Sequence, residues 1–138
     1  MGREQENIEL VQRGFAHLRA TGAPPQEIFA PDFVWDMSTF RGWPEQPTYV
    51  GIDGVRAFLA DWIGAFDDWE IEFESVHAIG DKVVWVGRQR GRAKTTGAMV
   101  DMLIAQVFTI RDGIQTRMEM YADPEEAFSA TGLAQAAG

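Results

Sequence analysis

WEIEFESVHAI, residues 69–79, is the stretch of this sequence that decides the fold. Upstream of it the apolar residues recur with the 3.6-residue period of a helix, whereas here they alternate with polar residues at a period of two. Such alternation is typical of a strand with one buried and one solvated face. Gly80-Asp81 follows as a hairpin signal, which predicts that the chain turns back into a further strand.

Three more strands are expected after this turn, over residues 82–92, about 98–110 and about 114–121. Arg111-Asp112-Gly113 marks the tight turn between the last two. Asp123-Pro124-Glu125-Glu126 then predicts a final short helix, because it offers an N-cap aspartate, a proline at the first helical position and acids in the first turn. Gly132 predicts the end of that helix.

The N-terminal half is predicted to be mainly helical. A helix over residues 4–20 has one apolar face, formed by Ile8, Val11, Phe15 and Leu18. The other elements expected here are a short helix at about 25–30, a short strand at 33–37, a loop over 38–50 and a helix from about Asp53 to Phe66. This order predicts an α+β fold: a cone-shaped, strongly bent antiparallel sheet with helices on its concave side, which leaves a cavity.

Composition restricts the classes of function. The chain has 138 residues, the size of one domain, and its net charge of −9 disfavours nucleic acid as a partner. The absence of cysteine excludes disulfides and thiol nucleophiles, and His17 and His77 lack a metal-binding spacing. No apolar run approaches the roughly 20 residues of a membrane span, and no secretory signal is visible. A cytoplasmic protein without metal or membrane contact is therefore expected.

Strand alternation also predicts which side chains face the cavity. The more apolar face of each strand, together with aromatic residues of the helices, supplies Phe15, Trp35, Met37, Phe58, Trp62, Trp85, Met102, Phe108, Met118 and Met120. These residues are predicted to bind a small hydrophobic ligand, although the same side chains also suit an ordinary core. Gln89 and Gln106 fall on the same faces. A buried amide such as Gln106 must either bond to the backbone or meet a ligand.

Three segments stand out in combination: FAPDFVW at 29–35, YVGIDGVRAF at 49–58 and AQVFTIRDG at 105–113. With YADPEEAF at 121–128 they resemble the nuclear transport factor 2-like superfamily, and within it the group of SnoaL-like polyketide cyclases and ketosteroid isomerases. The resemblance covers nearly the whole chain and implies a single SnoaL-like domain over residues 1–138 with a cystatin-like α+β roll. It implies little about function, because the scaffold hosts isomerases, cyclases and non-catalytic binders.

The catalytic sets of the best-understood relatives do not match this sequence. By the resemblance, the base, tyrosine and acid positions of the isomerases fall on Met37, Gly14 and Gln106. The Asp-Arg-Asp positions of the epoxide hydrolases fall on Gly87, Gln89 and Met120. Steroid isomerisation and epoxide hydrolysis by those sets are therefore not expected.

Two functions from different classes stay open. The first is a cofactor-free cyclase, isomerase or lyase acting on an apolar carbonyl compound, with Asp36 as general base and Gln106 and His17 polarising the carbonyl. Asp36 faces inward only if a one-residue bulge shifts the first strand. The alternative is a non-catalytic protein that binds a hydrophobic ligand or dimerises. In either case a homodimer is expected through the outer face of the sheet, which would carry Leu103, Ala105, Val107 and Thr109.

Overall fold

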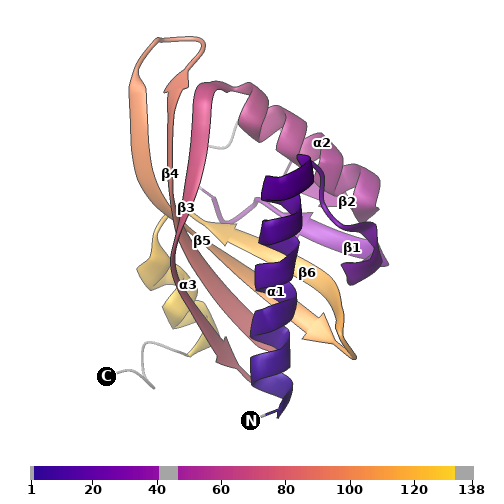
Figure 1. Ribbon diagram of the computed structural model, residues 1–138. Helices are drawn as coiled ribbons and strands as arrows, with labels where there is room; N and C mark the ends of the chain where they lie inside the picture. Colours follow the sequence, from indigo (N-terminus) through magenta and orange to yellow (C-terminus); the bar gives the residue numbers. More distant parts are fainter. Residues whose placement is uncertain (1, 41–46, 133–138) are drawn as a thin grey trace.

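The computed structural model describes residues 2–40 and 47–132. Its elements, in chain order, are α1 Gly2–Thr21, the 3-10 turn η1 Gln26–Ile28, β1 Phe29–Asp36, β2 Thr48–Val50, α2 Gly51–Gly64, β3 Phe66–Ile79, β4 Lys82–Ala93, β5 Met99–Arg111, β6 Ile114–Tyr121 and α3 Pro124–Thr131. Three helices and a curved, unclosed sheet of six strands confirm the predicted α+β fold (Figure 1).

The strands of the sheet lie in the order β2-β1-β6-β5-β4-β3. The long strands β3 to β6 form the predicted antiparallel meander. One pair departs from the antiparallel pattern, because β1 lies parallel to β6. The short strand β2 lies in the stretch predicted as a loop and pairs with β1; residues 41–46 of that stretch lie outside the described residues.

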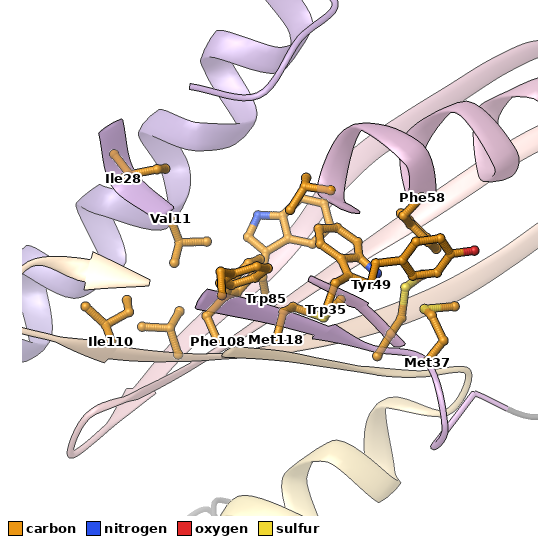
Figure 2. Packing of buried hydrophobic residues seen from close by; sticks show 14 of the residues in the cluster. Val11, Ile28, Trp35, Met37, Tyr49, Phe58, Trp85, Phe108, Ile110 and Met118 are labelled. Carbon is orange, nitrogen blue, oxygen red and sulfur yellow. The ribbon is translucent and has the colours of Figure 1, made fainter. Parts of the chain in front are cut away.

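Helices α1 and α2 cover one face of the sheet, the inner face, and α3 lies against the opposite, outer face (Figure 1). The larger hydrophobic cluster fills the inner side. Val11 of α1 and Phe58 of α2 are each 1% exposed there and belong to one cluster with side chains of the sheet (Figure 2). Within the described residues, no helix has both the length and the hydropathy that a membrane span requires.

The local signals for α3 are confirmed. The Asp123 side chain accepts a hydrogen bond from the backbone N–H of Glu125 at 3.0 Å, and Pro124 opens the helix. Gly132 ends it with a φ of 84°, a left-handed conformation that glycine adopts without steric cost.

Helix α3 covers apolar residues of the outer face that were expected to be free. Ala127 is fully buried and belongs to one cluster with Val84, Val86, Ala105 and Val107. Of the four residues predicted to contact a second copy, Ala105 and Val107 are buried in this cluster and Leu103 packs against it half-buried. The fourth, Thr109, is buried outside this cluster. The homodimer through the outer face stays a prediction, and α3 already occupies part of that face.

A bulge in β3 decides which side chains of this strand face inward. Asp68 is the additional residue between the pairs Asp67↔Arg92 and Glu70↔Arg90, and its φ is 55°. One extra residue reverses the alternation of a strand. As a result Trp69 lies on the inner side with Ile71, where both line a cavity.

Replacing Asp68 with valine is expected to lower the free energy of unfolding by about 1–2 kcal/mol, because a β-branched residue clashes in the left-handed region. Replacing it with glycine should leave stability unchanged or raise it slightly. Urea denaturation measures both changes. The same two substitutions at Asp67, which is exposed and outside the left-handed region, are the control. Equal tolerance of valine at both positions would contradict the bulge.

Candidate functional site

A cavity of about 60 Å³ lies on the inner face, between the two helices and the sheet. Helix α1, the turn after it, helix α2 and strands β1, β3, β5 and β6 contribute to its wall. The described residues that line it are Val11, Gly14, Phe15, Leu18, Pro24, Pro25, Phe29, Trp35, Val55, Phe58, Leu59, Trp62, Trp69, Ile71, Ile104, Gln106, Phe108, Gln115 and Met120.

The volume limits what the cavity holds as it stands. A water molecule occupies about 30 Å³ in the liquid, and an apolar cavity of about 150 Å³ accepts benzene. The cavity of about 60 Å³ therefore has room for about two water molecules and is too small for an aromatic ring. Side chains at its edge must move before a larger molecule enters. Phe15, Leu18 and Leu59 are half-buried and lie at that edge.

Three buried polar side chains interrupt the apolar wall. Trp35 and Gln106 are each 5% exposed, and Gln115 is 2% exposed. Within residues 2–40 and 47–132, the indole N–H of Trp35 and the Oε1 atoms of both glutamines have no hydrogen-bond partner. Leaving such a group buried and unpaired costs about 1–3 kcal/mol. A protein that keeps three of them around one cavity presents unmet hydrogen-bonding capacity to whatever fills that cavity.

Gln89 does not line the cavity itself but forms hydrogen bonds with two tryptophans that do. Its Oε1 accepts a hydrogen bond from the Trp62 indole N–H at 2.7 Å and from the Trp69 indole N–H at 2.8 Å. Both partners are donors, so the orientation of the amide is fixed by chemistry. Since Trp62 belongs to α2 and Trp69 to β3, this one oxygen ties the helix to the edge strand of the sheet.

The structure brings together seven of the site residues predicted from the sequence. Around the cavity lie Phe15, Trp35, Phe58, Trp62, Gln106, Phe108 and Met120. Three others, Met37, Trp85 and Met118, are buried in the hydrophobic cluster away from the lining, and Met102 packs against that cluster half-buried. Those four pack in or against the cluster, and their contact with a ligand stays a prediction.

Trp85 shows that a side chain on the inner face can pack against a helix instead of lining the cavity. Its side chain faces inward as predicted, but Phe15 stacks on its ring with the centroids 3.9 Å apart. Its indole N–H donates to Gln12 Oε1 at 3.2 Å. Trp85 therefore fastens α1 to the sheet, and α1 covers the ring completely.

Asp36 lies outside the cavity lining, and its role as general base stays a prediction. It follows Trp35 on β1 and therefore faces the outer side. There its carboxylate accepts a hydrogen bond from the backbone N–H of Ser38 at 2.8 Å and forms an ion pair with Arg117. The irregularity in β1 falls between Phe29 and Val34, before this point, and leaves Trp35 rather than Asp36 inward.

His17 is also outside the lining. It is exposed near the end of α1, where its Nδ1 lies 2.9 Å from the carbonyl oxygen of Ala23. This contact ties the histidine to the turn after the helix. The role of His17 in polarising a carbonyl group stays a prediction, and its ring does not line the cavity.

The ion pairs of the long strands lie outside the cavity lining too. Arg88 of β4 donates a hydrogen bond to Asp101 of β5 at 2.8 Å, and Arg90 pairs with Glu72 at 3.2 Å. The hydrogen bond from Arg88 holds the pKa of Asp101 below its ordinary value. Among the described residues that line the cavity, none carries an ionisable side chain, and none of the described residues form a group of three or more that could hold a metal ion.

Gln115 is the buried polar residue of the lining that the sequence did not predict. Strict alternation from Met118 and Met120 places residue 115 on the outer face. However, the pairs Ile110↔Gln115 and Thr109↔Arg117 leave Thr116 as an additional residue. This bulge turns Gln115 inward. No residue type in the stretch marks it, so the signal was not present in the local sequence.

A family model for the SnoaL-like domain matches residues 11–118 of the chain. A proposed SnoaL-like polyketide cyclase from Jannaschia sp. CCS1 is 26% identical over 95% of this chain and 94% of its own, with a TM-score of 0.72. An NTF2-like protein from Burkholderia thailandensis E264 is 25% identical over 90% and 95%, with a TM-score of 0.74. TerC, co-crystallised with polyporic acid, is 25% identical over 91% and 97%, with a TM-score of 0.69. No curated protein matches the chain.

Proposed function

This chain belongs to the SnoaL-like domain family of the nuclear transport factor 2-like superfamily, and we propose that it binds one small, neutral and largely apolar molecule in the cavity of its inner face. The observation that carries the proposal is the character of the lining: apolar and aromatic side chains with three unpaired polar atoms and, among the described residues, no ionisable group.

The absence of charge in the described lining argues for a neutral ligand. A carboxylate, phosphate or ammonium group that enters an apolar cavity loses its hydration, and this costs several kcal/mol unless an opposite charge or several hydrogen bonds replace the water. The described residues that line the cavity offer no opposite charge. The co-crystal of TerC with polyporic acid supports the idea that a chain of this fold accepts a small molecule.

The same lining argues for binding over acid/base catalysis. A general base or acid must reach the reacting atom within hydrogen-bond distance. Gln106 and Gln115 are amides, which neither take up nor release a proton near neutral pH. Asp36 and His17, the predicted proton carriers, face other surroundings. We therefore expect that a molecule bound in this cavity is released without chemical change.

A cofactor-free cyclase or isomerase is the second candidate, and the similarity to the proposed polyketide cyclase favours it. It would require a proton carrier to reach the ligand after the side chains at the edge of the cavity have moved. If Asp36 were that carrier, Asp36→Asn would abolish turnover.

Native mass spectrometry of freshly purified protein separates the two candidates. We expect a co-purifying neutral molecule that is recovered with the same mass before and after prolonged incubation with the protein. A second mass that accumulates with time, and that Asp36→Asn suppresses, would instead establish the enzyme. The protein denatured before incubation is the control for spontaneous change of the ligand.

A further inference from the structure

Two of the unpaired polar atoms are complementary to each other. Trp35 offers an N–H donor and Gln106 offers the acceptor Oε1, and each is buried without a partner among the described residues. The Gln106 Nε2 atom contacts the sulfur of Met120 at 3.8 Å. Rotating the amide by half a turn would place its oxygen against that sulfur, which is a weak acceptor and not a donor. The acceptor of Gln106 is therefore the atom left without a partner.

The two side chains come from strands on either side of β6. Trp35 pairs with Met118 and Gln106 pairs with Met120, two residues further along the same strand. Since residues two apart lie on one face, both side chains stand on the inner face over the middle of β6. Gln115 lies at the other end of the cavity, opposite Phe29 and Ile110. The donor and the acceptor therefore stand beside neighbouring inward positions of β6, and Gln115 lies apart from them.

We propose that Trp35 and Gln106 determine specificity by recognising a hydroxyl group on the ligand. The inference rests on the proposed function, because it names the chemistry of the molecule that the cavity binds. A hydroxyl group accepts a hydrogen bond from the Trp35 indole and donates one to Gln106 Oε1. A carbonyl group satisfies the indole alone, and a C–H group satisfies neither. The ligand class is therefore a neutral, otherwise apolar molecule with a free hydroxyl group.

Phenol and toluene test this directly, because they differ only in a hydroxyl and a methyl group on the smallest aromatic ring. Their dissociation constants are measured by NMR titration of ¹⁵N-labelled protein, and the indole signal of Trp35 is assigned from the Trp35→Phe variant. In the wild-type protein phenol is expected to shift the Trp35 indole N–H signal downfield, whereas toluene does not. The preference for phenol is defined as the dissociation constant of toluene divided by that of phenol.

Trp35→Phe and Gln106→Met are each expected to reduce this preference about tenfold, the effect of one hydrogen bond to a buried group. Phe58→Leu is the matched control, since Phe58 lines the same cavity and has no polar atom. It should change the affinity for both probes alike and leave their ratio unchanged. Thermal midpoints of all three variants show whether each is folded.

The outcomes separate the inference from the proposed function. If both probes bind and the ratio is the same in the wild-type protein, Trp35→Phe and Gln106→Met, the hydroxyl recognition is overturned and the binding function stands. If neither probe binds the wild-type protein, the proposed function fails and the inference falls with it. A reduced ratio in Phe58→Leu equal to that in Gln106→Met would also overturn the inference, because apolar packing would then explain the preference.

Discussion

Gln89→Met is expected to lower the free energy of unfolding by about 2–4 kcal/mol. The substitution keeps the size of the side chain but removes the one oxygen that accepts hydrogen bonds from Trp62 and Trp69. The buried Trp62 and the half-buried Trp69 both lose this acceptor, and a buried polar group that loses its partner costs about 1–3 kcal/mol. Urea denaturation followed by tryptophan fluorescence measures the loss, because both reporters lie at the site of the change.

Gln106→Met is the matched control for this prediction. Gln106 is another buried glutamine facing inward, on the neighbouring strand, but its Oε1 accepts no hydrogen bond from the described residues. Its replacement removes an unpaired polar atom and is expected to leave stability unchanged or to raise it. Equal losses for the two variants would contradict the distinction between a glutamine that holds the fold and one that is kept for a ligand.

Gly87→Ala is expected to cost about 3 kcal/mol, because overpacking costs about 1–3 kcal/mol and each lost stacking or hydrogen-bonding contact adds about 1 kcal/mol. A β-carbon at Gly87 would lie 2.3 Å from the ring of Trp85. The ring is not free to yield, since Phe15 stacks on it and its N–H is bonded to Gln12. The alanine must therefore displace the ring that fastens α1.

Two controls define the cause of this loss. Gly64→Ala, at the end of α2, meets no atom within 4 Å and should be neutral or slightly stabilising. A double variant that combines Gly87→Ala with Trp85→Leu tests whether the new β-carbon clashes with the Trp85 ring. If Trp85 is that partner, Gly87→Ala should cost clearly less in the Trp85→Leu background than in the wild-type protein. Simple additivity of the two losses, measured by urea denaturation, would contradict the clash.

The parts of the fold that the sequence predicts well are those with local signals. Asp123, Pro124 and Gly132 mark the ends of α3 within a few residues, and the alternation over 69–79 marks β3. The parallel pairing of β1 with β6 and the short strand β2 escaped prediction because they depend on contacts between distant segments. The packing of α3 against the outer face of β4 and β5 was not predicted either, because it also depends on contacts between distant segments.

The candidate site was predicted only as far as alternation holds. Trp35, Gln106, Phe108 and Met120 were assigned to the inner face, and they line the cavity. Gln115 was missed because the additional residue Thr116 reverses the alternation of β6. Alternation also cannot separate a residue that lines a cavity from one that packs beside it. For this reason the predicted inward-facing set also contains Met37, Met102, Met118 and Trp85, which lie in or against the hydrophobic cluster and outside the lining.

The central claim is that the inner cavity accepts a neutral molecule and rejects a charged one, and an NMR titration with phenol and benzoate at neutral pH tests it most directly. The two probes share an aromatic ring and differ in charge. We predict that phenol shifts the indole signal of Trp35, which lines the cavity, and that benzoate leaves this signal unchanged. Binding of benzoate at the Trp35 indole as tightly as phenol would contradict it.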